Sequence, residues 1–155
     1  MTPDELFRVL SLDSISISAL QAQLTQGMNV RETECNAHVE FQLTPSAVEN
    51  AAPAQFALHI RLSCNGTPIR GNTKTRLFDL EIKALAIYRQ ATTEPVSLSD
   101  FSANHTVFAR QVFPALALRA QSLLEQLGLH NIRLPVDLPH DLNNSGQTTT
   151  PVVLN

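Results

Sequence analysis

Apolar and polar residues alternate strictly in three parts of the chain. Between Val30 and Leu43 the odd positions from Cys35 onward are apolar and the even positions are polar. The alternation returns with the opposite parity from Phe56 to Cys64, and again from Phe78 to Tyr88. A period of two residues is typical of a strand with one face in the core and one in water. The pattern therefore predicts three strands, with a loop over residues 44–53 and a turn over residues 65–68.

The apolar sides of these strands can be matched as antiparallel neighbours. The match predicts that Phe41 faces Leu58, that Cys35 faces Cys64, and that Ile60 faces Phe78. The two cysteines would then be neighbours on the core face. They are either a redox pair or two small buried side chains, and the second interpretation is favoured because free cysteine is usually buried.

The N-terminal segment is expected to form a further strand. Leu6, Leu10 and Leu12 keep an even parity, whereas Ile15 and Ile17 are odd. A change of parity of this kind is typical of a β-bulge, here near residues 13–14. Because the segment carries apolar residues on both faces, a partner subunit is expected to bury one of them.

One long helix is predicted between Thr106 and Leu127, where apolar residues recur every three or four positions. Asn104 and Gly128 are its expected N-cap and C-cap. Pro114 should kink the helix or mark its true start, since proline lacks an N–H and crowds the preceding turn. An extended, proline-bounded crossover follows over residues 132–138.

These elements predict a single domain over residues 1–142 and a flexible tail over residues 143–155, where hydrophobicity is low. The expected fold class is α+β, a four-stranded antiparallel sheet with one long helix packed on one face.

Composition excludes several classes of function. The 155 residues carry 11 Lys and Arg against 14 Asp and Glu, a net charge of −3, which argues against a nucleic-acid partner. No apolar stretch has the length of a signal peptide or a membrane span, so a cytoplasmic protein is expected. No motif for phosphate binding, dinucleotide binding, metal ligation or a catalytic nucleophile is present. We therefore expect no enzyme, no cofactor and no metal; a small enzyme assembled from distant residues is the remote alternative.

The segment Phe108–Pro139, FARQVFPALALRAQSLLEQLGLHNIRLPVDLP, resembles the helix and crossover of the SecB-type export chaperones. It has a helix with an internal Phe-Pro, a glycine that ends the helix, and a Leu-Pro crossover, and the resemblance spans about residues 5–139. It implies an ATP-independent chaperone that holds unfolded polypeptides or preproteins in apolar surface grooves. It also implies a homotetramer, a dimer of dimers with first strands and long helices at the interfaces.

The candidates for client binding lie in three places. They are Leu24, Met28 and Val30 in an expected connection over residues 20–30, Phe108 early in the helix, and Leu134, Val136 and Leu138 in the crossover. The alternative for each is core packing or a subunit contact. In this family an acidic sheet surface docks the ATPase SecA, and Asp13 and Glu81 fall where two of its acidic positions would be. The alternative for both is an ordinary solvated carboxylate.

The sequence departs from the family in two places. Pro139 and the polar residues 143–146 stand where a lid helix would be, and Ser16 or Ile17 replaces a further acidic position. A general export factor and a dedicated chaperone of a toxin–antitoxin, phage or other accessory system fit these features equally. The rival interpretation is an adaptor or inhibitor that binds one folded partner.

Overall fold

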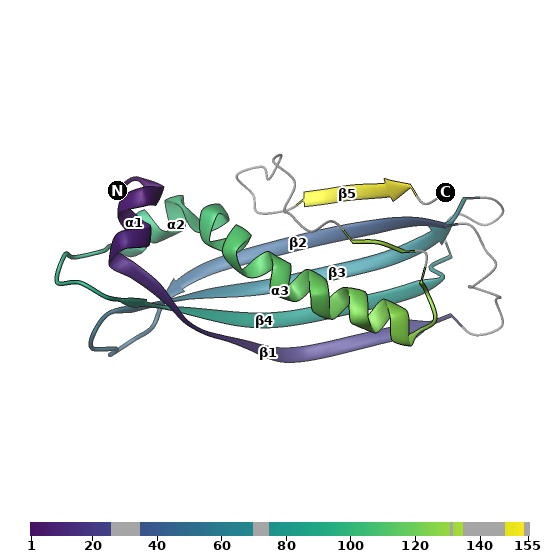
Figure 1. The fold of residues 1–155 in the computed structure, drawn as a ribbon, viewed down its shortest axis with the longest axis horizontal. Helices are drawn as coiled ribbons and strands as arrows, with labels where there is room; N and C mark the ends of the chain where they lie inside the picture. The colour runs from purple at the N-terminus through teal and green to yellow at the C-terminus, as the bar shows by residue number, and fades with distance from the viewer. Residues whose placement is uncertain (26–34, 70–74, 131, 135–147, 154–155) are drawn as a thin grey trace.

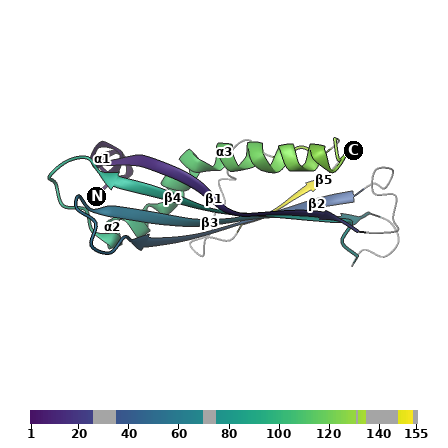
Figure 2. The same cartoon turned by 90° about the horizontal axis from the view of Figure 1, so that it is seen from below.

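The alternating segments form long strands in one sheet. The computed structural model describes residues 1–25, 35–69, 75–130, 132–134 and 148–153. In chain order the elements are α1 (Pro3–Val9), β1 (Leu10–Leu24), β2 (Cys35–Ala47), β3 (Gln55–Pro68), β4 (Phe78–Gln90), α2 (Leu98–Ala103), α3 (His105–Gln126) and β5 (Thr148–Val153). The helix α3 lies across one face of the sheet (Figure 1, Figure 2).

All neighbouring strands are antiparallel, in the order β1-β4-β3-β2-β5. The predicted fold class, a four-stranded antiparallel sheet with one long helix on one face, is confirmed. Three elements were not expected: the short helices α1 and α2, and the strand β5, which adds a fifth strand beside β2. The flexibility of residues 143–155 stays a prediction.

The predicted strand register was wrong. Phe41 lies opposite Leu62 rather than Leu58, and Ile60 lies opposite Ala84 rather than Phe78. The shifts are of four and six residues, both even, so the alternating apolar side chains still face the core. Alternation fixes the face of a strand but not its position along the neighbour. Position depends on where the strands end, and β2 continues to Ala47, well into the predicted loop.

The bulge predicted in the first strand is confirmed. The pairing of β1 with β4 shifts between Leu12 and Ser14, and shifts a second time between Ile17 and Ala19. Because β1 continues to Leu24, it also includes the start of the expected connection.

The chain before β1 is helical, contrary to the expected strand. Leu6 and Val9, one turn apart, are buried on one side of α1. The Thr2 side chain accepts a hydrogen bond from the Glu5 amide, and the Thr2 amide donates to the Glu5 carboxylate over 2.7 Å. This reciprocal cap stabilises a short helix where apolar periodicity alone gave no signal. The Thr2 amide also lowers the pKa of Glu5 below its usual value.

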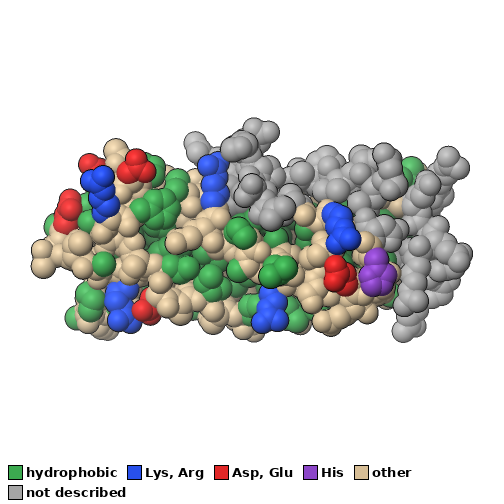
Figure 3. Space-filling view, viewed as in Figure 1, with side chains coloured by type: hydrophobic (Ala, Val, Ile, Leu, Met, Phe, Trp, Pro, Cys, Tyr) green, Lys and Arg blue, Asp and Glu red, His purple; other side chains and the backbone are tan. Residues whose placement is uncertain are grey.

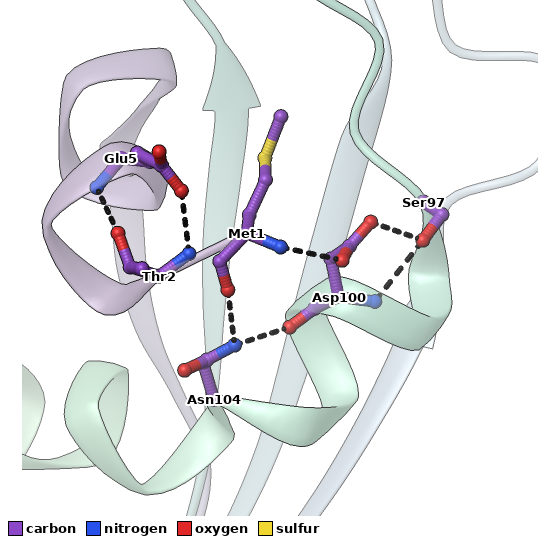
Figure 4. A network of polar contacts seen from close by, with 6 residues as sticks. All are labelled: Met1, Thr2, Glu5, Ser97, Asp100 and Asn104. Carbon is purple, nitrogen blue, oxygen red and sulfur yellow. Dashed lines mark hydrogen bonds and ion pairs between the residues drawn. The ribbon is translucent and has the colours of Figure 1, made fainter.

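A polar network joins α1 to α2 (Figure 4). The amino group of Met1 lies 3.1 Å from Oδ1 of Asp100, and the Ser97 hydroxyl donates to the other carboxylate oxygen. These two donors, Ser97 first, lower the pKa of Asp100. The side-chain amide of Asn104 donates from Nδ2 to the Asp100 carbonyl over 2.9 Å. Asn104 occupies the predicted N-cap position of α3, but its side chain makes no cap hydrogen bond to that helix.

The end of α3 matches the prediction. Gly128 has a φ of 81°, and its amide donates to the Glu125 carbonyl while the Leu129 amide donates to the Leu124 carbonyl. This pair of bonds is a Schellman motif, which glycine favours because the position is left-handed. The helix continues through Pro114, which therefore does not mark its start.

Aromatic side chains fill the core where α1, α2 and α3 meet the sheet. The ring of Phe108 lies 4.8 Å from that of Tyr88, 5.0 Å from Phe101 and 5.1 Å from Phe7. The Tyr88 hydroxyl, buried in this cluster, donates to the Phe108 carbonyl over 3.1 Å. The cluster fixes the first turns of α3 onto β4.

The two cysteines are buried and are not opposite each other. Cys35 faces Pro68, and Cys64 faces Val39. Burial raises the pKa of Cys64 to about 12, with smaller contributions from Cys35 and Asp79. A protonated, buried thiol is a poor nucleophile. The interpretation as small buried side chains agrees with this environment.

Candidate functional site

Apolar side chains of β1 remain exposed on the face that α3 covers. Ile15, Ile17 and Leu20 pair with buried β4 residues and therefore point to the same side of the sheet, yet they are 37%, 38% and 49% exposed. We call these three residues the β1 strip. The helix adds Leu118, which is 73% exposed. In Figure 3 hydrophobic side chains gather across the middle of this face, with charged side chains around them.

The crossover is tied to α3 by one glutamine. Gln121 donates from Nε2 to the Ile132 carbonyl over 2.8 Å, and its Oε1 accepts from the Leu134 amide over 3.1 Å. Ile132 is buried, whereas Leu134 is half-buried at the margin of the core. The side chain of Gln121 therefore holds the first crossover residues in an extended form beside the helix.

Two of the predicted client-binding residues lie at the margin of the core. Leu134 is one, and Leu24 at the end of β1 is the other; both are half-buried. β1 and α3 end at the same end of the molecule (Figure 1). Met28, Val30, Val136 and Leu138 lie outside the described residues.

Phe108 is placed differently. Its side chain is 1% exposed and belongs to the aromatic cluster. Phe108 therefore packs in the core, which was the alternative to client binding. A client could reach this ring only if the cluster opened.

The opposite face of the sheet is largely polar, and both predicted docking carboxylates lie beside basic side chains. Glu81 lies 2.6 Å from Arg61 and 3.4 Å from Lys83, and the hydrogen bond from Arg61 lowers the pKa of Glu81. Asp13 lies 3.1 Å from Arg89. Arg89 and Glu81 are eight positions apart on β4, a separation of about 27 Å along a strand. The structure thus does not bring the two predicted docking carboxylates together.

A hollow of about 320 Å³ lies on this polar face between β1, β2, β3 and β4. Its lining includes Gln21, Ser63 and the paired residues Arg61 and Glu81. In the part of the chain that the structure describes, no group of three or more His, Cys, Asp or Glu residues could hold a metal ion. The hollow thus presents amide groups and the Arg61–Glu81 ion pair.

Comparison with known proteins identifies the architecture. No protein-family model matches the chain, and no curated protein matches its sequence. A solved structure does match: the SecB-like chaperone Rv1957 of Mycobacterium tuberculosis, in complex with a ChAD peptide from the Rv1956 HigA1 antitoxin. The match has a TM-score of 0.63 at 12% identity and covers 85% of this chain and 93% of that one. The chain has a SecB-like fold. The resemblance seen in residues 108–139 is thereby confirmed at the level of the fold.

Sequence reasoning singled out Ile15 and Ile17 but missed Leu20 and Leu118 among the exposed apolar residues of this SecB-like fold. Leu20 was assigned to a connection, and Leu118 lies off the helical stripe that was read as the core face. An apolar residue that breaks the period of a helix was the available signal. Among the helices that the structure describes, none combines the length and the apolarity needed to cross a bilayer.

Proposed function

We propose that the protein is an ATP-independent, SecB-like molecular chaperone that holds non-native polypeptides in the cytoplasm. The observation that carries the proposal is the shared fold: 85% of the chain superposes on a SecB-like chaperone whose structure contains an antitoxin peptide. The exposed apolar side chains of this chain support the same conclusion, because a binder of unfolded segments needs apolar surface rather than converging catalytic groups.

The proposed client surface begins where the crossover leaves α3. Half-buried Leu24 and Leu134 can give contact area without losing their attachment to the core. Each Å² of apolar surface removed from water contributes about 25 cal/mol, irrespective of the client's sequence. We propose that the client surface also includes the predicted groove residues Met28, Val30, Val136 and Leu138.

We also propose a homotetramer, a dimer of dimers, with the β1 strip and Leu118 at a subunit interface. Four large apolar residues exposed on one face form the kind of patch that an oligomer buries.

A dedicated client is favoured over a general export role. The two carboxylates expected to dock SecA are each paired with an arginine, Asp13 with Arg89 and Glu81 with Arg61. A paired carboxylate presents little net charge to a basic partner. We therefore propose a chaperone that serves one client system, such as an antitoxin, without engaging SecA.

The decisive assay measures aggregation without nucleotide. Citrate synthase unfolded by heat and insulin unfolded by reduction should both remain in solution in the presence of equimolar protein. Suppression of neither, combined with tight binding of a single folded protein from the native host, would establish the rival adaptor function. SecA immobilised on a sensor should give no signal with the wild-type chain.

A paired variant locates the surface. Leu134→Gln should weaken protection, whereas Leu98→Gln, which changes an exposed leucine on α2, should leave it intact. Equal protection by the two variants would exclude the crossover from the client surface. Thermal melting of both variants confirms that each is folded.

A further inference from the structure

The two edges of the sheet are protected in different ways. At one edge β1 is irregular, because bulges interrupt its pairing at residues 12–14 and 17–19. Bulges discourage the addition of a further strand. At the other edge β2 pairs without interruption over its 13 residues, and β5 covers part of it, from Asn36 to Phe41. The regular edge is thus the one that the chain covers with its own C-terminal segment.

Prolines show which way the backbone groups of β2 point. In an antiparallel pair, opposed residues alternate between those that exchange both N–H···O=C bonds and those whose groups point away from the neighbour. Pro45 lies opposite Leu58, and Pro68 lies opposite Cys35. Since proline has no N–H, neither pair can be of the bonded kind. The odd-numbered residues of β2 therefore direct their backbone groups away from β3, toward the outer edge.

The two halves of this edge differ in what they offer. Ala37, Val39 and Phe41 have both a donor and an acceptor, and β5 lies opposite all three. The other half, residues 42–47, has no paired strand on this side among the described residues. Its central outward residue is Pro45, which has no donor, and proline is a common means of blocking an edge. Proline protects one half, and β5 protects the half that would otherwise accept a strand.

The sequence of β5 suits this position. Pro151 lies opposite His38, an even residue of β2, so the missing N–H of Pro151 faces away from β2. The residues that face the bonding groups of β2 are Thr148, Thr150 and Val152. The strand TTTPVV is uncharged and has five β-branched residues, which favour extended structure.

We propose that the β2 edge from Asn36 to Phe41 is a strand-acceptor site that β5 fills within the same chain, and that an extended, uncharged client segment rich in β-branched residues replaces β5 there. The tail is then an internal competitor of the client. The exchange with a client rests on the proposed chaperone function, whereas the filling of the edge by β5 does not. Six residues on one neighbour make β5 the shortest strand of the sheet, which suits a segment that must leave.

The test uses two full-length variants that differ only in which way the altered amide points. Thr150→Pro removes a donor that faces β2 and should release β5. Thr149→Pro removes a donor on the side of Pro151, facing away from β2, and should keep β5 in place. The probe is a fluorescein-labelled peptide of residues 146–155, and its binding is followed by fluorescence anisotropy.

The peptide should bind the Thr150→Pro variant at least tenfold more tightly than the wild type or the Thr149→Pro variant. If β5 is docked nine-tenths of the time, only one-tenth of the sites are free, so its release lowers the apparent Kd about tenfold. A labelled peptide carrying Thr150→Pro should not bind. Equal affinity of the three proteins for the unaltered peptide would overturn the proposal.

Hydrogen exchange gives a measurement that does not depend on the peptide. The amides of Ala37, Val39 and Phe41 should be protected in the wild type and in Thr149→Pro, and should lose protection in Thr150→Pro. Fast exchange at all three amides in the wild type would refute the docking of β5. Protection in β3 and β4 reports that each variant is folded.

Competition separates the two parts of the proposal. Reduced, carboxymethylated lactalbumin, an unfolded protein, should displace the labelled peptide from Thr150→Pro. Binding of lactalbumin without displacement would overturn the exchange while leaving the filled edge intact. If lactalbumin binds none of the proteins, the chaperone function fails, and the peptide and exchange results still decide whether β5 fills the edge.

Discussion

Replacing Leu118 tests whether the exposed apolar face is a subunit interface. The variant Leu118→Gln keeps the length of the side chain and its helix propensity, so α3 should fold normally. It removes apolar surface from a residue that is 73% exposed in the isolated chain. Any effect on self-association then comes from the interface rather than from the stability of the subunit.

The size of the effect follows from the exposed area. Complete burial of a leucine side chain contributes about 2–3 kcal/mol, and Leu118 has roughly three-quarters of that still to gain, about 2 kcal/mol in each copy. In a twofold-symmetric interface the residue counts twice, about 4 kcal/mol for a pair. Glutamine keeps part of the apolar stem, so the dissociation constant should rise by a factor between about 10 and 1,000.

Sedimentation velocity over a range of protein concentrations measures this shift. The matched control is Leu98→Gln, an exposed leucine on α2, outside the proposed interface. The wild type and Leu98→Gln should form tetramers at micromolar concentration, while Leu118→Gln should dissociate. A monomeric wild type, or identical behaviour of the three proteins, would refute the assignment of this face to subunit contact.

Three further predictions concern the stability of the subunit. Gly66→Ala should lower the free energy of unfolding by about 1–3 kcal/mol in urea titration, because an added Cβ would collide with the ring of Phe78. Gln121→Leu should cost about 1–3 kcal/mol in the same assay, since two backbone groups of the crossover lose their partner; hydrogen exchange at residue 134 should accelerate. Acid should loosen the junction of α1 and α2. The lowered pKa values of Glu5 and Asp100 give stability that is complete above their usual values of 4.5 and 3.8 and is lost as the pH falls through the folded values. Thermal melts from pH 7 to pH 3 should show this decline, and Glu5→Gln should reduce it.

The sequence predicted the elements that depend on periodicity. Strict alternation in β2, β3 and β4 identified both the strands and their buried faces, and the three-to-four spacing identified α3 with its glycine at the end. The register escaped prediction because the free energy of apolar burial is the same for every even shift of one strand along another. The length of the connection between β2 and β3, rather than hydrophobicity, determines which of these shifts is adopted.

Elements that depend on local hydrogen bonds or on distant partners were missed. α1 is short and is stabilised by the reciprocal cap of Thr2 and Glu5, which apolar patterning does not detect. β5 has six residues with little core-forming character, and β2, the strand with which it pairs, lies more than a hundred residues earlier in the chain. A pattern read in sequence order cannot reveal such pairing.

The candidate site could be predicted only in part. Leu24 and Leu134 were chosen as apolar residues outside the main stripes, and both lie at the core margin. Phe108 was chosen as an apolar residue early in the helix, yet Tyr88 and Phe101 enclose it, and those contacts come from β4 and α2. The ion pair of Asp13 joins β1 to β4, and the ion pair of Glu81 with Arg61 joins β4 to β3. Their prediction therefore required the strand register, which the sequence pattern did not provide.

The length of α3 determines where the rest of the chain can travel. Successive residues of a helix are rotated by about 100° around its axis, so one residue more or fewer before Gly128 would redirect the exit by that angle. The left-handed turn at Gly128 therefore fixes the direction in which the chain leaves the helix. Insertions or deletions inside α3 should change that direction and move β5 away from β2, even where the helix itself tolerates them.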